Sequence, residues 1–203
     1  MKTNKPKLIS LDFDDCLYDL MSLNVKYVKD KYGVINIHRK IKNYYHIYHT
    51  YPSIGDDLWN HPENYIQGKL LQGAKEFYAE LVDYYGVEAI QIVTSSMENI
   101  VEVKNEMIRE KFGITCDIKH SIFNKISKHE LTGNTVLVDD HIDNVINHVE
   151  FNDASGIIFN YMDLDYIKER AILIDGKYQK ISYANDYETL LKMIHKKVAM
   201  RNK

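Results

Sequence analysis

The sequence predicts an α/β fold in which a parallel sheet lies between two layers of helices, with a small helical insert after the first strand. Two patterns carry this prediction. Short apolar runs bounded by polar or turn residues are typical of strands buried on both faces. Between these runs, apolar residues recur at helical spacing, and strands that alternate with helices form parallel sheets. The strongest strand candidates are residues 8–11, 89–93, 135–138 and 156–159.

Residues 17–72 are expected to form the insert, because they show helical patterns, many aromatic residues and no strand pattern. One helical face carries Met21, Val25 and Val28, and Gly33 is a typical end for that helix. A second apolar stripe consists of Ile41, Tyr44, Tyr45 and Tyr48. The predicted domain organisation is therefore a core of residues 1–16 and 73–203, interrupted by a helical segment of residues 17–72.

The second half of the chain continues the alternation. Residues 73–85 predict an amphipathic helix between two glycines, Gly73 and Gly86. Another helix is expected around residues 100–107. The remaining expectations are a short strand at 114–118, a hairpin at 171–181 around Asp175-Gly176, and a final helix over 187–194 followed by a basic tail that is expected to be solvated.

Composition narrows the class of protein. The chain has 203 residues, 45% hydrophobic residues and a net charge of −3, which suits one domain with a sizeable core. This charge predicts no strong binding to nucleic acid or to an anionic membrane. We expect no signal peptide and no transmembrane span, and Cys16 and Cys116 are read as reduced thiols in a cytoplasmic protein. A homodimer is left open by the sequence.

Polar side chains follow three of the predicted strands at the point where each strand ends. Asp12 and Asp14 follow the first strand, Thr94 and Ser95 the second, and Asp139 and Asp140 the third. In an open parallel sheet, the carboxyl ends of the strands form the edge where ligands bind. Carboxylates that cluster there repel one another unless a hard cation lies among them, and oxygen ligands in small number suit Mg²⁺.

These residue types point to phosphoryl transfer. An aspartate is ionised at neutral pH and can attack phosphorus directly, which forms an aspartyl-phosphate. A second acid two residues further along a strand points to the same side, where it can protonate the leaving oxygen. Hydroxyl groups and a lysine would balance the charge of the transferring group.

The motifs Asp12-Phe13-Asp14, Thr94 and Asp139-Asp140 resemble those of the haloacid dehalogenase (HAD) superfamily of phosphatases. Within it, the chain is most similar to the 5′(3′)-deoxyribonucleotidases. The segments that carry this likeness are Leu58-Trp59, Gly73-Ala74, Ile92-Val93-Thr94-Ser95, Val136-Leu137-Val138-Asp139-Asp140 and Ser182-Tyr183-Ala184-Asn185-Asp186-Tyr187. The resemblance implies a Rossmann-like, three-layer core, a cap formed by residues 17–72, and a Mg²⁺-dependent hydrolase acting on a small phosphomonoester such as a nucleoside monophosphate.

The resemblance also implies a role for each matched residue. Asp12 would be the nucleophile and a Mg²⁺ ligand, and Asp14 the general acid and base, with its backbone carbonyl on the metal. Asp140 would complete the metal ligands, supported by Asp139 or Asn144. Thr94 and Ser95 would hold the phosphoryl oxygens together with a lysine, for which Lys128 is preferred over Lys125. Trp59 and Tyr65 match cap positions that would stack on a base.

The chain departs from the family pattern at Asp15, where glycine is usual, at Cys16 and at Ser96. A thiolate mechanism at Cys16 is rejected because neighbouring carboxylates raise the pKa of a thiol. Two other substrates fit the superfamily: a sugar phosphate and the terminal phosphate of a nucleic acid. The alternative from another class is a catalytically silent binding or regulatory protein, against which the pair Asp12 and Asp14 argues.

Overall fold

The computed structural model describes residues 7–34, 46–54, 61–122, 125–174 and 178–201, and within them a six-stranded parallel sheet. The strand order is β3-β2-β1-β4-β5-β6. The bounds are β1 Ile9–Leu11, β2 Ile90–Ser96, β3 Asp117–Ile122, β4 Val136–Asp139, β5 Ser155–Phe159 and β6 Ile181–Ala184. This confirms the predicted α/β class and its parallel sheet.

The first strand lies in the middle of the sheet. Leu11 is in register with Ile92 of β2 on one side and with Val138 of β4 on the other. Its one polar residue, Ser10, is buried but shares a hydrogen bond of 2.7 Å with Thr135 Oγ1 and accepts another from Gln91. Because β1 and β4 run in register, Asp12 and Asp139 each come one residue after the pair Leu11–Val138, at one edge of the sheet.

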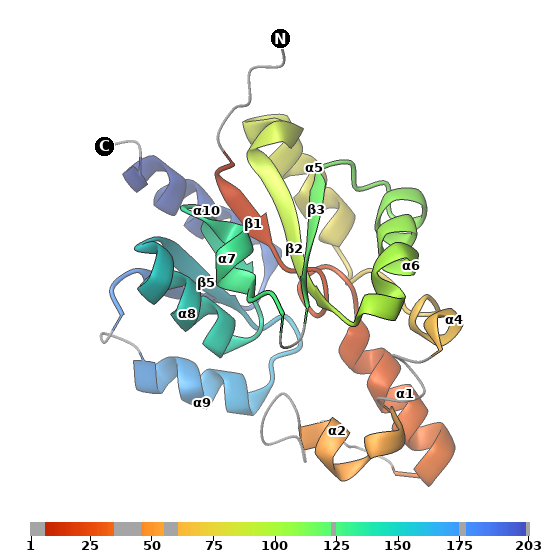
Figure 1. Ribbon diagram of the computed structural model, residues 1–203. Coiled ribbons are helices and arrows are strands. Elements are labelled where there is room, and N and C mark those ends of the chain that lie inside the picture. The colour runs from red at the N-terminus through yellow and green to blue at the C-terminus, as the bar shows by residue number, and fades with distance from the viewer. Residues whose placement is uncertain (1–6, 35–45, 55–60, 123–124, 175–177, 202–203) are drawn as a thin grey trace.

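Helices cover both faces of the sheet (Figure 1). Helices α5 (Ala74–Tyr85) and α10 (Tyr187–Arg201) pack against one face, and α7 (Lys128–Thr132) and α8 (Ile142–Asn152) against the other. The predicted glycines do end α5 at both termini, since Gly73 is its N-cap and Gly86 its C-cap. The remaining helices of the core are η2 (Val87–Ala89), η3 (Glu98–Ile100), α6 (Val101–Glu106), η4 (Met107–Lys111) and α9 (Asp165–Ile174).

The segment 17–72 contributes α1 (Leu20–Tyr32), α2 (His46–Thr50) and α4 (Pro62–Tyr65). Figure 1 shows these helices beyond the edge of the sheet at which β1 ends. The chain leaves and re-enters the core at adjacent points, because the Leu71 N–H donates to Leu17 O and the Asp19 N–H donates to Lys69 O. The expected helical character holds in the described residues, and the proposed boundaries of the insert stay a prediction.

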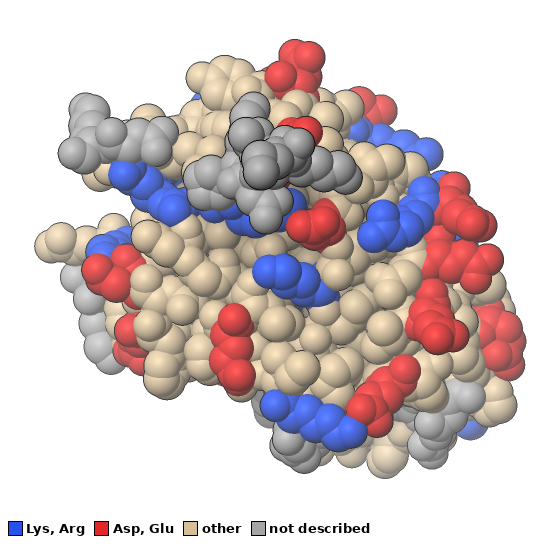
Figure 2. Space-filling model, turned by 45° about the horizontal axis from the view of Figure 1, so that its top comes forward, with Lys and Arg blue, Asp and Glu red and all other residues tan. Residues whose placement is uncertain are grey.

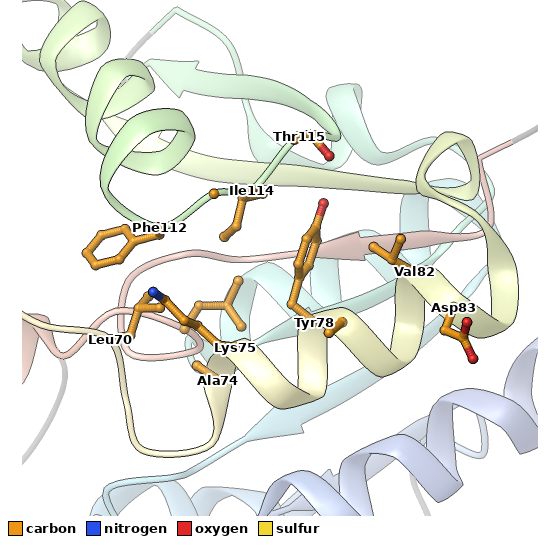
Figure 3. A pocket seen from close by; sticks show the side chains of 12 residues that line it. Leu70, Ala74, Lys75, Tyr78, Val82, Asp83, Phe112, Ile114 and Thr115 are labelled. Atoms are coloured by element: carbon orange, nitrogen blue, oxygen red, sulfur yellow. The ribbon is translucent and has the colours of Figure 1, made fainter.

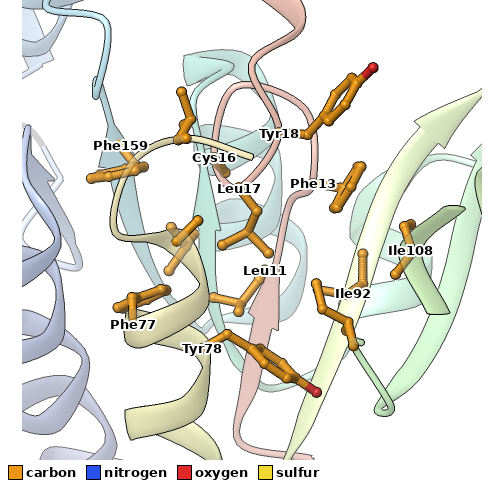
Figure 4. Packing of buried hydrophobic residues seen from close by; sticks show 14 of the residues in the cluster. Leu11, Phe13, Cys16, Leu17, Tyr18, Phe77, Tyr78, Ile92, Ile108 and Phe159 are labelled. Atoms are coloured by element: carbon orange, nitrogen blue, oxygen red, sulfur yellow. The ribbon is translucent and has the colours of Figure 1, made fainter. Parts of the chain in front are cut away.

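Aromatic and aliphatic side chains fill the space between β1 and the helices (Figure 4). Phe13 and Tyr18 stack with their ring centroids 5.3 Å apart, on the loop that follows β1. On another side of this loop, Tyr187 of α10 packs on Phe77 at 4.8 Å and donates a hydrogen bond to Cys16 O. The loop that follows β1 is therefore fixed by packing from several directions.

Three local expectations differ from the structure in whole or in part. Residues 171–174 end helix α9, so the expected hairpin at 171–181 does not form, and β6 instead pairs in parallel with β5. The strand expected at 114–118 begins later, at Asp117. The basic tail is not wholly solvated, because Lys197 is buried and donates to Lys180 O, and Arg201 donates to Leu8 O.

On the face shown in Figure 2, acidic and basic side chains are interspersed. No helix among the described residues is long and apolar enough to cross a membrane.

Candidate active site

The loop after β1 is built by backbone and carboxylate hydrogen bonds. The N–H groups of Leu17 and Tyr18 both donate to Phe13 O, which turns the chain sharply. Asp15 takes the left-handed conformation with φ 52°, where glycine is favoured, and its carboxylate accepts from the Met21 N–H at 2.7 Å. Since Met21 lies in the first turn of α1, this contact satisfies a free N–H of the helix and offsets part of the backbone cost.

Asp12 and Asp140 converge at the edge of the sheet. A carboxylate oxygen of each and Cys16 Sγ all lie within 4.8 Å of one another. The pKa of Asp12 is raised to about 7, chiefly by burial; the charge of Lys128 opposes this rise, and the charges of Asp139 and Asp14 contribute to it. Burial also raises the pKa values of Asp15 and Asp140 well above their ordinary range. Keeping these buried carboxylates ionised therefore costs free energy, and a bound cation would offset that cost.

Cys16 lies among these acids as a neutral thiol. Burial raises its pKa well above the usual value, and the charges of Asp140 and Asp12 raise it further. This agrees with the expectation that Cys16 does not supply a thiolate.

Of the two lysines considered from the sequence, Lys128 is the one that contacts Asp12 and Asp139. It begins α7, whose N-terminus is closed by a capping box between Ser127 and Glu130. Its Nζ lies 2.6 Å from Asp139 Oδ2 and 3.0 Å from Asp12 Oδ2. Burial alone would lower the pKa of Lys128, but the two carboxylates outweigh it and the pKa is raised. The competing candidate, Lys125, is exposed and pairs with Glu98 at 2.5 Å.

Asp139 is surrounded by donors. Its Oδ1 accepts from the His141 N–H at 2.8 Å and from Asn144 Nδ2 at 3.1 Å, while its Oδ2 accepts from Lys128. Asn144 and the His141 N–H thus hold Asp139, and Asp139 in turn holds Lys128. The residue that groups with Asp12 is Asp140.

Thr94 and Ser95 end the neighbouring strand in different surroundings. Thr94 is fully buried, and its Oγ1 has no hydrogen-bond partner within the described part of the chain. A buried hydroxyl without a partner is unfavourable, so it points to a ligand that would complete it. Ser95 is exposed, and its hydroxyl shares a hydrogen bond of 2.9 Å with Ser121 of β3.

Lys104 lies beside Asp14 and was not among the site residues predicted from the sequence. Its Nζ lies 2.6 Å from Asp14 Oδ2 and 2.9 Å from Ser95 O, and the side chain is 0% exposed. The spacing could have revealed it, because Lys104 lies four residues from both Ile100 and Ile108 and so belongs to the apolar stripe of its helix.

Tyr65 is fully buried rather than open to solvent. Its hydroxyl donates to Asp14 Oδ1, its ring packs on Tyr18 at 5.2 Å, and Lys104 Nζ lies 5.4 Å from the ring centroid. Stacking on a base, as expected from the sequence, would require the ring to leave these contacts. Trp59, the other expected stacking residue, lies outside the described residues.

The donor set of the site fits a hard cation. Carboxylate oxygens of Asp12 and Asp140 lie close together, and burial is the main cause of the raised pKa of both acids. Oxygen ligands of this kind are those that Mg²⁺ prefers. Asp14 could add its backbone carbonyl, as the sequence analysis expects. The thiol of Cys16 is a soft ligand and suits Mg²⁺ poorly.

An apolar groove of about 480 Å³ lies elsewhere, between α5 and the loop that follows η4 (Figure 3). None of the acidic residues of the site lines it. Its lining residues are Leu17, Leu70, Ala74, Lys75, Tyr78, Ala79, Val82, Asp83, Phe112, Gly113, Ile114 and Thr115.

Solved structures share this fold. The HAD-hydrolase YfnB from Bacillus subtilis, solved with magnesium bound, matches with a TM-score of 0.58 at 12% identity, over 94% of this chain and 99% of its own. A haloacid dehalogenase-like hydrolase from Xanthomonas campestris matches with a TM-score of 0.51 at 14% identity, over 99% and 97% of the two chains. No family model and no curated protein matches the sequence.

A third structure, a phosphonoacetaldehyde hydrolase-like protein from Oleispira antarctica, matches with a TM-score of 0.52 at 11% identity, over 96% of this chain and 94% of its own. At such low identity these matches establish the fold alone. The chain therefore has the HAD-like, Rossmann-like fold that the motif resemblance implied.

Proposed function

We propose that this chain is a HAD-type hydrolase, specifically a Mg²⁺-dependent phosphomonoesterase that works through an aspartyl-phosphate on Asp12. The observation that supports it best is that Asp12, Asp140 and Lys128 lie together at one edge of the sheet. Strand β2 carries Thr94 near its end at the same edge, and the Thr94 hydroxyl has no partner among the described residues. Carboxylate, ammonium and hydroxyl groups are the groups that transfer of a phosphoryl group requires.

In the proposed reaction, Asp12 attacks phosphorus in line and the bond to the leaving oxygen breaks. Lys128 holds Asp12 in position at 3.0 Å and balances charge on the phosphoryl oxygens, to which Thr94 donates its hydroxyl. Asp14 gives its proton to the leaving oxygen and then takes one from the water that releases phosphate from Asp12. Mg²⁺, held by Asp12, Asp140 and the Asp14 carbonyl, would screen the negative charge of both reactants.

For the substrate we propose a nucleoside monophosphate, as a 5′(3′)-deoxyribonucleotidase would use. The sequence motifs alone support this finer assignment. The two residues expected to stack on a base give no structural support, since Tyr65 is buried and Trp59 lies outside the described residues. A panel of nucleoside monophosphates, sugar phosphates and 5′- or 3′-phosphorylated oligonucleotides checks it. Turnover of sugar phosphates with none on nucleotides would replace the proposed substrate but keep the chemistry.

The chemistry is tested by phosphate release with Mg²⁺ present. We expect Asp12→Asn to lower the rate by at least about 10³-fold, because the amide cannot act as the nucleophile. Asp19→Asn is the matched control: Asp19 caps α1 by accepting from the Ser22 N–H and takes no part in the proposed steps. Equal rates for Asp12→Asn and the wild-type protein would contradict the proposal.

A further inference from the structure

A fully buried lysine lies against the acid that the proposed reaction needs, and neither the fold nor the attack by Asp12 accounts for it. Lys104 contacts Asp14 at 2.6 Å from within the apolar stripe of its helix, together with Ile100 and Ile108. An ammonium group is costly to bury unless it is paired. Replacing such a pair with apolar residues is often neutral for stability, so a structural need alone does not explain a lysine there.

Both oxygens of Asp14 are held, and by different parts of the chain. Oδ2 accepts from Lys104 of α6, and Oδ1 accepts from the hydroxyl of Tyr65 in α4. Burial and the charge of Asp14 raise the pKa of Tyr65 well above its usual value, so the phenol stays a donor. The backbone carbonyl of Tyr65 in turn accepts from Tyr18, in the loop that carries Asp14.

The surroundings of Lys104 restrict the directions its ammonium can take. Its Nζ also donates to Ser95 O at 2.9 Å and lies 5.9 Å from the Phe13 ring and 5.4 Å from the Tyr65 ring. Charge-assisted hydrogen bonds and cation–π contacts together favour one position for the ammonium. Asp14 is therefore fixed in orientation relative to the end of β2, where Thr94 lies.

We propose that Lys104 is a positioning residue that holds Asp14 for proton transfer to the leaving oxygen, with Tyr65 as a second support from the inserted segment. This inference rests on the proposed function. In the first step, the O–H proton of Asp14 moves to the leaving oxygen as the P–O bond breaks, and Asp14 becomes a carboxylate. In the second, that carboxylate takes a proton from water as the water oxygen bonds to phosphorus and the Asp12–phosphorus bond breaks.

A positioning role differs from a structural one in its dependence on the leaving group. The nitrophenolate of p-nitrophenyl phosphate leaves without a proton, whereas the alkoxide of a nucleoside monophosphate needs one. We expect Lys104→Met to lower the single-turnover rate of leaving-group release by about 100-fold with the nucleoside monophosphate and by less than about fivefold with p-nitrophenyl phosphate. Single-turnover release is measured because it reports the first step alone, whereas hydrolysis of the aspartyl-phosphate uses Asp14 with both esters. Lys104→Arg, which keeps the charge and the donors, should recover part of the loss on the nucleotide.

Lys111→Met is the matched control. Lys111 lies in the adjoining η4 and donates to Ile66 O and Gly68 O, but it has no contact with Asp14. We expect this control to change the two rates by the same small factor. Because Lys104 acts through Asp14, adding Lys104→Met to Asp14→Asn should cause no further loss on the nucleotide.

If Lys104→Met does not fold, Tyr65→Phe serves as the second variant, because it removes only a hydroxyl donor to Asp14. We expect it to show the same selectivity with a smaller loss of rate, about fivefold on the nucleotide. Equal losses on the two esters, or unchanged rates in both lysine and tyrosine variants, would overturn the inference while leaving the phosphatase intact. A wild-type protein that releases phosphate from neither ester would instead reject the proposed function, and this inference would fall with it.

Discussion

Two buried threonines differ in whether their hydroxyl groups are bonded. Thr94 Oγ1 has no partner in the described part of the chain, whereas Thr132 Oγ1 donates to His129 O at 3.1 Å and lies 2.8 Å from His148 Nδ1. A buried hydroxyl without a partner lowers stability, and a bonded one does not. Comparing the two residues therefore tests the proposal that the Thr94 hydroxyl binds a ligand.

We expect Thr94→Val to raise the free energy of unfolding by about 1 kcal/mol and to lower kcat/KM for phosphate release by about 10–100-fold. Thr132→Val, of the same size, should lower the free energy of unfolding by about 1–3 kcal/mol. Urea denaturation and steady-state kinetics on both variants check this. A stability loss at Thr94 equal to that at Thr132 would argue against a ligand-binding hydroxyl.

The two candidate lysines offer a second test at this scale. Lys128→Met removes the ammonium that lies between Asp12 and Asp139, and we expect kcat to fall by about 10²–10³-fold. Lys125→Met breaks only an exposed pair with Glu98, and we expect a change within about twofold. Phosphate release measured side by side distinguishes them. Similar effects of the two substitutions would count against Lys128 as the site lysine.

At the residue scale, strand ends were the informative signal. Asp12 and Asp140 could be placed together because parallel strands end at one edge, and the structure brings their carboxylates within 4.8 Å. Lys104 could not be placed in that way, because its contact with Asp14 joins residues 90 positions apart and depends on how α6 packs. Its spacing from Ile100 and Ile108 indicates a buried position but does not show which acid it contacts.

At the scale of elements, helix α8 packs directly on strand β5. Gly156 makes this contact possible, since a Cβ there would lie 2.4 Å from Val145 Cγ1. We expect Gly156→Ala to lower the free energy of unfolding by about 1–3 kcal/mol, because α8 would have to shift away from the sheet. Ser155→Ala, the neighbouring residue of β5, should stay within about 0.5 kcal/mol of the wild-type protein.

Thermal or urea unfolding measures both changes. Since α8 begins at Ile142, shortly after Asp139 and Asp140, a shift of α8 should also reduce phosphate release in Gly156→Ala. Equal stability of the two variants would contradict the prediction that close packing of α8 on β5 requires glycine at residue 156.

The elements also show where local pattern stops being informative. The buried strands β1, β2 and β4 were predictable, because strands covered on both faces consist largely of apolar residues. The region 171–184 was not, because β6 is half-buried and a turn pair such as Asp175-Gly176 favours a hairpin in isolation. Ile167 packs with Ile142 and Ile158 in a second apolar cluster, and this packing favours helix α9 over a hairpin. The spacing of residues in the sequence does not reveal that contact.

For the whole molecule, the buried acids predict a pH dependence. Burial raises the pKa of Asp12 from 3.8 to about 7, and Asp15 and Asp140 are also raised. A group with a raised pKa in the folded state contributes stability that is present below its unfolded pKa and is lost as pH rises through the folded value. Without metal, the free energy of unfolding should therefore decline as pH rises from about 4 to beyond about 7.

Mg²⁺ should reverse this trend, because it binds the ionised carboxylates and competes with protons. We expect the rise in melting temperature caused by Mg²⁺ to be larger at about pH 8 than at about pH 5.5, and EDTA to abolish it. Asp12→Asn should flatten the difference between the two pH values. A Mg²⁺ effect of the same size at both would contradict a site made of these acids.

The central place of β1 has a consequence for synthesis on the ribosome. The first strand to emerge is the one whose two neighbours, β2 and β4, are translated much later. Until β2 and β4 have been synthesised, the apolar strand β1 lacks backbone hydrogen-bond partners on both sides. Exposed strands of this kind are prone to aggregation. A nascent chain halted before residue 136 should therefore be retained by a general chaperone, and release should follow once β4 has left the exit tunnel.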